Sequence, residues 1–276
     1  MGGATRRSTG PRPFPYSSQM HPPEHDGGAN VSIFPTTAAM ARAAADTAAD
    51  ILTEAVAERG IAHAMFATGN SQFAFVDALV NHTDGVPWAD MVIFHIDEYV
   101  GLGADHPASF RRWIHQRIEE PAHPRAAHYL DGLAPPADEC RRYAALLEEY
   151  PLDLCCLGIG ENGHLAFNDP PVADFEDGQR VKVVELDQGC RRQQVDEGHF
   201  ATDGDVPRLA MTVTIPALLA ATRVLAIVPE GRKAIAVQAA LEGPVGTSCP
   251  ASILQRTPHA SVFLDADSAG LLASRA

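Results

Sequence analysis

The amino-acid sequence predicts an α/β protein with a mainly parallel sheet, helices on both faces of that sheet, and a single domain. Short apolar runs, each typical of a buried strand, alternate with longer segments of helical character, and this alternation favours a parallel sheet covered on both faces. The chain has 276 residues, near the upper limit for one hydrophobic core, and no internal repeat divides it.

The N-terminal segment is predicted to precede the fold. Residues 1–30 are rich in Gly, Pro, Ser and His and show no periodicity, so they are interpreted as a disordered tail before a folded domain, 31–276. The first predicted element of that domain is an Ala-rich helix. Thr36 and Thr37 supply its N-cap, and Gly60 stops it.

The later elements follow in alternation. Apolar or alternating runs are interpreted as strands at 61–67, 91–96, 152–159, 181–186, 209–215, 223–228 and 260–264. Helices are expected at 72–81, 108–119, 137–149, 231–242 and 266–274. Polar and glycine-rich clusters follow three of the strands, at 68–72, 97–101 and 158–169. Because ligands of such sheets bind beyond the carboxyl ends of the strands, we expect these clusters to form one composite site.

The composition argues against several classes of function. With 21 Lys and Arg against 35 Asp and Glu, the net charge is −14, and this negative field disfavours binding to nucleic acid or to an anionic membrane. A few local cations and backbone N–H groups suffice to hold a small phosphorylated substrate. Five cysteines without a C-x-x-C pair argue against a disulfide framework or a zinc site. No apolar run approaches the roughly 18 residues of a transmembrane helix, and we expect a cytoplasmic protein.

The first polar cluster, Thr68-Gly69-Asn70-Ser71-Gln72, lies between a predicted strand and a predicted helix. Small residues let backbone N–H groups approach an anion, and the N-terminus of a helix adds a partial positive charge. A phosphate or a carboxylate fits such a loop. The alternative interpretation is an ordinary strand-to-helix turn with an N-cap.

The second cluster contains two adjacent carboxylates, Asp97 and Glu98, directly after a buried strand. If strand alternation continues, their side chains point to opposite faces, so one can enter a site while the other caps or pairs structurally. A carboxylate at a partly dry strand end can act as the base for a carbon-bound proton. The alternative is a solvated acidic turn.

The third cluster, 157–170, has three glycines within six residues, then His164, and Asp169 five positions later. No Gly-Lys-Ser/Thr follows, so it is not a Walker loop, and it is not a clean dinucleotide fingerprint. An imidazole–carboxylate pair between His164 and Asp169 would set the tautomer of the histidine and move protons near neutral pH. The alternative is a histidine that only satisfies a loop carbonyl.

The fourth feature is Lys233, one of only two lysines, at the start of a predicted helix. Because the helix dipole disfavours a cation there, a lysine at this place hints at an anionic ligand. The alternative is an ordinary surface lysine. Arg191 and Arg192 form a similar but weaker candidate.

Three motifs together resemble the glucosamine-6-phosphate deaminase family. They are FHIDEYVGL at 94–102, LGIGENGHLAFNDP at 157–170 and ALEG at 240–243. The resemblance covers roughly 31–270 and implies a Rossmann-like α/β fold, which that family shares with the 6-phosphogluconolactonases. It also implies conversion of glucosamine 6-phosphate to fructose 6-phosphate with loss of ammonia, and no metal or organic cofactor. The partner is then a small phosphorylated amino sugar, and family members range from monomers to hexamers, so a homo-oligomer is compatible.

The resemblance also assigns roles to residues. It makes Asp97 the base that moves a proton between C2 and C1, and His164 the group that helps to open the sugar ring. Neighbouring polar groups, Asn162 and Asp169, orient that histidine. The substrate-binding residues implied by the resemblance are Thr68, Gly69, Asn70, Ser71, Gln72, Gly163, Lys233 and, on a mobile lid, Arg192 or its neighbour Arg191.

The chain departs from the family pattern at several positions. Asn162 and Asp169 stand where Asp and Glu are common, His95 where Asn is common, and 170–182 does not reproduce the family's allosteric residues. These departures bear on the substrate more than on the fold. The alternatives are a 6-phosphogluconolactonase, a deaminase or isomerase of another amino-sugar phosphate, and a non-catalytic sugar-phosphate sensor.

Overall fold

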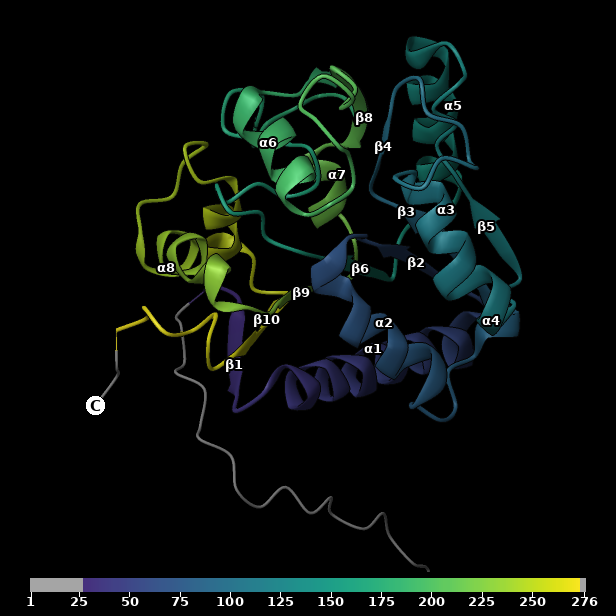
Figure 1. The fold of residues 1–276 in the computed structure, drawn as a ribbon. Helices are drawn as coiled ribbons and strands as arrows, with labels where there is room; N and C mark the ends of the chain where they lie inside the picture. Colours follow the sequence, from purple (N-terminus) through teal and green to yellow (C-terminus); the bar gives the residue numbers. More distant parts are fainter. Residues whose placement is uncertain (1–26, 274–276) are drawn as a thin grey trace, which may run out of the picture.

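The computed structural model describes residues 27–273, and its core is a seven-stranded sheet (Figure 1). Most of the predicted N-terminal tail, 1–26, lies outside the described residues, but Asn30 already belongs to a strand. Every pair of neighbouring strands in this sheet is parallel, which confirms the predicted architecture. The strand order is β1 (Asn30–Phe34), β10 (Ala260–Asp265), β9 (Arg223–Val228), β6 (Leu154–Leu157), β2 (Ala62–Phe66), β3 (Met91–His95) and β5 (Ala126–His128).

Side chains of the central strands alternate between two apolar cores. In β2, Ala64 and Phe66 face one core, whereas Met65 faces the other. The first core lies under α1 (Thr37–Arg59), α2 (Phe73–Asn81) and α3 (Phe110–Ile114). The second lies under α5 (Pro136–Glu149), α7 (Ile215–Leu219) and α8 (Ala234–Glu242). Helices therefore cover both faces, as predicted.

The long helix α1 begins and ends where the sequence predicts. The hydroxyl of Thr36 accepts a hydrogen bond from the amide of Ala39 at 3.2 Å. At the other end, Gly60 has a φ of 75° and donates its N–H to the carbonyl of Val56 at 2.7 Å. The helix buries mainly alanines, and these small side chains let its backbone lie close to the sheet.

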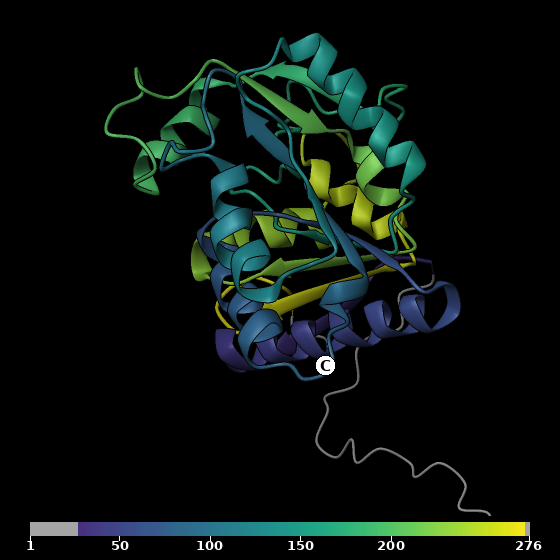
Figure 2. The same cartoon turned by 90° about the vertical axis from the view of Figure 1, so that its right-hand side faces the viewer.

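A second sheet of three antiparallel strands was not predicted. Its order is β4 (Asp97–Tyr99), β8 (Leu209–Val213) and β7 (Val181–Glu185). Only Ile96 separates β3 from β4, so the chain passes from the large sheet to the small one immediately before Asp97. Helix α6 (Gln188–Asp196) follows β7, and in Figures 1 and 2 this helix and the small sheet lie at the far end of the molecule from α1.

The remaining helical turns are short. Single turns of 3₁₀ helix occupy Asn70–Gln72, Trp88–Asp90 and Gly231–Lys233, and a longer one Pro250–Arg256. The predicted helix at 108–119 is divided into α3, a π turn at His115–Glu119 and the short α4 (Glu120–Ala122). None of the described helices combines the length and apolar character that a membrane crossing requires.

The predicted helix at 266–274 is wrong. The described part of this segment forms successive turns after β10. Asp265 accepts a hydrogen bond from the amide of Ser268 at 2.8 Å, and Gly270 donates to the carbonyl of Asp267. Such local side-chain and turn bonds compete with the helical pattern.

Candidate active site

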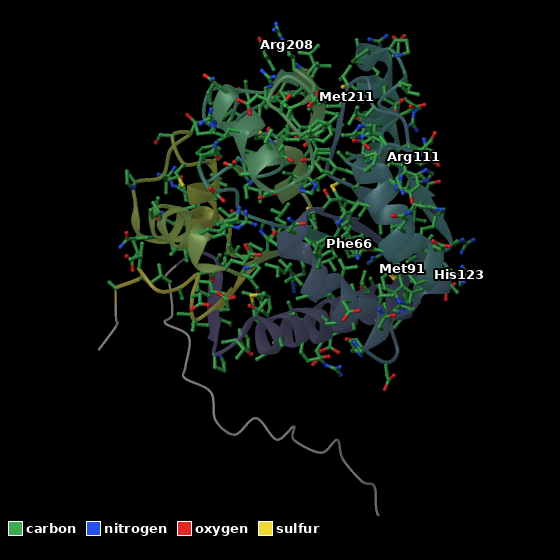
Figure 3. All side chains as sticks on the ribbon, in the orientation of Figure 1. Phe66, Met91, Arg111, His123, Arg208 and Met211 are labelled. Carbon is green, nitrogen blue, oxygen red and sulfur yellow. The ribbon has the colours of Figure 1, made fainter. Side chains whose placement is uncertain are left out.

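One cavity collects most of the polar clusters that follow the strands. It lies beyond the carboxyl ends of β2, β3 and β6 and has a volume of about 90 Å³. Phe66 at the end of β2 and Met211 in β8 are labelled in Figure 3 and locate the two sheets that contribute to the site. The polar side chains and glycines that line it are Thr68, Gly69, Asn70, Ser71, Asp97, Gly158, Gly160, His164, Gln193, Gln194, Glu197, His199 and Lys233.

The loop after β2 supplies one end of the cavity. Thr68, Gly69, Asn70 and Ser71 all line it, as the sequence predicts for an anion-binding loop. Gly69 has a φ of 97°, a conformation that favours glycine and turns the chain into the 3₁₀ helix ahead of α2.

The fifth residue of this predicted loop, Gln72, does not line the cavity. Its side chain is buried, and Nε2 donates to the carbonyl of Ile227 and to Oγ of Ser71, both at 3.2 Å. Gln72 therefore ties the loop to β9, and the structure gives it a supporting place rather than the predicted contact with substrate.

Asp97 points into the cavity from the first position of β4, beside Thr212 of β8. Its side chain is 5% exposed, and Oδ1 has no hydrogen-bond partner among the described residues. Burial, together with the charges of Glu98 and Asp169, raises the pKa of Asp97 well above its ordinary value. A carboxylate that is poorly stabilised in this way is a stronger base than one in water.

Glu98 points away from the cavity and caps α3. Its carboxylate accepts hydrogen bonds from the amides of Tyr99, Phe110 and Arg111 and from the hydroxyl of Ser109, at 2.7 to 3.3 Å. The sequence predicts that one of the two carboxylates enters the site while the other caps or pairs structurally. In the structure Asp97 lines the cavity and Glu98 caps α3.

His164 enters the cavity with Asp169 behind it. Its Nδ1 lies 2.9 Å from Oδ1 of Asp169, which has no direct access to the cavity. Burial alone would raise the pKa of Asp169, but contacts from His164 and Asn162 lower it below its usual value. The pair therefore places an ionised carboxylate beside the imidazole.

Asn162 connects the two members of this pair without lining the cavity. Its Nδ2 donates to Oδ1 of Asp169 at 2.8 Å, and its Oδ1 accepts from the amide of His164 at 3.0 Å. The glycines around it serve close packing. A Cβ atom on Gly160 would collide with the His164 ring, and one on Gly163 would lie 2.6 Å from Sγ of Cys249. Gly163, predicted to bind substrate, is thus a packing residue outside the cavity.

Lys233 reaches the cavity from the 3₁₀ turn ahead of α8. It is 3% exposed, and burial lowers the pKa of its ammonium group below the ordinary value. No carboxylate of the described residues lies within 4 Å of that nitrogen. The neighbouring Arg232, in contrast, is paired with Glu161, Glu197 and Glu230.

Arg192 does not line the cavity. Its side chain is 66% exposed, and its nearest carboxylate is that of Asp203 at 3.8 Å. The cavity wall contributed by this part of the chain comes instead from Gln193, Gln194, Glu197 and His199. The sequence offered little signal for these residues, because α6 is mostly polar and lacks a continuous apolar face.

Fold and site together define an α/β enzyme of the sugar-phosphate type, with a buried carboxylate, a histidine–carboxylate pair and a glycine-containing loop at the carboxyl edge of a parallel sheet. The chain belongs to the family of glucosamine-6-phosphate isomerases and 6-phosphogluconolactonases, whose sequence model matches residues 35–263.

Relatives and solved structures agree with this assignment. A glucosamine-6-phosphate deaminase of Exiguobacterium sibiricum is 34% identical over 211 residues, covering 76% of this chain and 81% of the relative. One of Listeria innocua is 33% identical, covering 75% and 86%. The solved structure of a monomeric glucosamine-6-phosphate deaminase is 29% identical, with a TM-score of 0.79 over 87% of this chain and 99% of that one. A 6-phosphogluconolactonase of Shewanella baltica shares the fold at 20% identity, with a TM-score of 0.72 and coverage of 87% and 99%.

Proposed function

We propose that this chain is a glucosamine-6-phosphate deaminase, which converts glucosamine 6-phosphate and water to fructose 6-phosphate and ammonia. The observation that carries the proposal is the joint position of Asp97 and the His164–Asp169 pair at one cavity. The relatives of similar length that carry this name support it. Such a phosphorylated sugar is charged and does not cross membranes unaided, so we also propose that the enzyme works in the cytoplasm.

The phosphate of the substrate binds at the end of the cavity formed by Thr68–Ser71 and Lys233. The small residues of the loop let backbone N–H groups approach an anion, and no carboxylate of the described residues lies within 4 Å of the buried ammonium group of Lys233. A phosphate dianion placed there compensates the ammonium group of Lys233 for the solvation that this group loses on burial. The phosphate thus serves as a handle that orients the reacting carbons.

His164 opens the pyranose ring. Its imidazole accepts the proton of the C1 hydroxyl and delivers a proton to the ring oxygen as the C1–O5 bond breaks. Asp169 stabilises the imidazolium that forms between these two steps, because it stays ionised 2.9 Å from Nδ1. The product of this step is the open-chain aldehyde.

Asp97 then carries out the isomerisation. Its carboxylate removes the proton from C2 while O1 takes a proton from the C2 ammonium group, which gives an enolamine, and the protonated carboxyl then returns its proton to C1. The resulting imine at C2 reacts with water, the C2–N bond breaks, and ammonia leaves behind the ketone of fructose 6-phosphate. The raised pKa of Asp97 suits this exchange, because a stronger base abstracts a carbon-bound proton more readily.

The test is an assay of purified protein with glucosamine 6-phosphate that measures ammonia and fructose 6-phosphate together. We expect the two products in a one-to-one ratio and no hydrolysis of 6-phosphogluconolactone in a parallel reaction. Hydrolysis of the lactone without ammonia release would replace the proposal by a lactonase. If neither glucosamine 6-phosphate nor the lactone reacts but galactosamine 6-phosphate releases ammonia, the protein is a deaminase of another amino-sugar phosphate. Binding of hexose phosphates without any turnover would indicate a sensor.

A further inference from the structure

Glu197 places a carboxylate at the same end of the cavity as Lys233. It follows the last residue of α6 and lines the cavity. Its Oε1 lies 2.8 Å from a guanidinium nitrogen of Arg232 and accepts a hydrogen bond from Nε2 of Gln193 at 2.9 Å. Its Oε2 lies 3.4 Å from Nε2 of His199. The carboxylate is therefore held in place on both oxygens.

The surroundings of Glu197 are those of a bound anion. Burial alone would raise the pKa of this carboxyl, but His199, Gln193 and the charges of Arg232 and Lys233 lower it to about 2. The backbone carbonyl of Glu197 also lies 3.5 Å from Nδ2 of Asn70, in the loop assigned to the phosphate. Glu197 thus lies near both the loop and the lysine that would hold a phosphate.

The lining of the cavity points to the same segment. Gln193, Gln194, Glu197 and His199, from α6 and the turn after it, form one of its walls. A hexose phosphate in this cavity would therefore lie directly against this wall.

We propose that Glu197 is an affinity-determining residue whose carboxylate occupies, in the ligand-free enzyme, the position beside Lys233 and Arg232 that the substrate phosphate takes. This inference rests on the proposed function, because it uses the phosphate end of that site. Binding of the phosphate breaks the Glu197–Arg232 pair, displaces the carboxylate and frees Arg232 to contact the anion. The carboxylate acts as a built-in competitor, and every phosphorylated ligand has to displace it.

The experiment compares wild-type protein with Glu197→Gln, which keeps the shape of the side chain and removes its charge. Titration calorimetry with inorganic phosphate is expected to show about ten-fold tighter binding in Glu197→Gln, since removal of one nearby like charge in a partly buried site is worth at least that factor. The KM for glucosamine 6-phosphate is expected to fall by a similar factor while kcat does not rise. Glu197→Ala is measured in the same way. A similar gain in phosphate affinity in this variant would show that the effect comes from removal of the carboxylate and not from the new amide group.

Glu161→Gln is the matched control. Glu161 also pairs with Arg232, at 3.2 Å, but its side chain is 44% exposed and lies outside the cavity wall. We expect its phosphate affinity to stay within about two-fold of wild type, because exposed charges are screened by solvent. An equal gain in both variants would assign the effect to Arg232 alone and overturn the role of Glu197.

The outcomes separate this inference from the function beneath it. Unchanged or weaker phosphate binding in both Glu197 variants, with glucosamine 6-phosphate still deaminated, would overturn the inference and leave the proposed function standing. Absence of deamination, together with equal phosphate affinity in wild type and Lys233→Ala, would overturn both.

Discussion

Asp97 and Glu98 are adjacent in the sequence, yet their carboxylates have opposite surroundings. Glu98 accepts four hydrogen bonds and caps α3, whereas Oδ1 of Asp97 is buried without a hydrogen-bond partner among the residues that the structure describes. Of these two carboxylates, that of Glu98 thus anchors the start of α3, and that of Asp97 is the one proposed to react. The first two predictions follow from this difference.

The activity is expected to fall as the pH is lowered, with a midpoint above the ordinary pKa of about 3.9 for an aspartate. The sign follows from the role of Asp97. A base works only when it is deprotonated, and burial raises the pKa of Asp97, so the active form is lost at a higher pH than for an exposed aspartate. The measurement is kcat/KM across pH. Asp97→Asn is expected to lose about 10²–10⁴-fold in kcat while still binding hexose phosphate, and near wild-type turnover in that variant would remove Asp97 as the base.

Glu98→Gln is expected to lower stability. The amide nitrogen of glutamine cannot accept, so two of the four donors around Glu98 lose their partner, at about 1–3 kcal/mol each. Thermal unfolding should show a decrease in Tm of about 5–15 °C for a chain of this size. Glu148→Gln, which removes an exposed ion pair with Arg180, is the control and should leave Tm nearly unchanged. Equal Tm values for the two variants would contradict the capping role.

Asp169→Asn tests the pair behind the ring-opening histidine. An amide at this position presents an N–H to Nδ1 of His164 and favours the wrong tautomer, so we expect kcat to fall by about 10²-fold or more with little change in KM. Steady-state kinetics at neutral pH measures both constants. Asp169→Glu keeps the charge and should retain more activity than the amide variant. The opposite order of the two variants would argue against an ionised partner for His164.

Lys233→Ala is expected to raise KM for the phosphorylated substrate about ten-fold or more and to change kcat less, because a handle on the phosphate contributes chiefly to binding. Arg192→Ala is the control, since it removes a nearby cation that lies outside the cavity. An unchanged KM in Lys233→Ala, or an equal rise in Arg192→Ala, would move the phosphate to another part of the molecule.

The large sheet could be predicted from sequence because its strands are buried on both faces. Runs such as 91–94 and 224–228 are continuously apolar, and α1 carries clear signals at both ends, in Thr36 and Gly60. The edge strands β1 and β5 were missed because their sequences, NVSIF and AAH, are short or only partly apolar. Edge strands bury one side less completely, so their pattern is weaker.

Part of the candidate site could likewise be predicted from the sequence, and part could not. Asp97, His164, Lys233 and the loop 68–71 stand next to strand ends in the sequence, and the topology of a parallel sheet brings such ends together. Glu197 and His199 could not be placed, because they reach the cavity only through the small antiparallel sheet that carries α6. The pairing of β4 with β8 joins segments more than a hundred residues apart, and no local pattern reports it.

The single residue between β3 and β4 has a consequence for the geometry of turnover. Ile96 lies between β3 of the large sheet, whose strand β2 leads into the loop 68–71, and β4 of the small sheet, to which Asp97 belongs. The distance between the loop 68–71 and Asp97 therefore depends on how the two sheets pack against each other. Since a misplacement of about 1 Å can cost on the order of 10²-fold in rate, substitutions in β7 or β8 that never touch the sugar can retune catalysis.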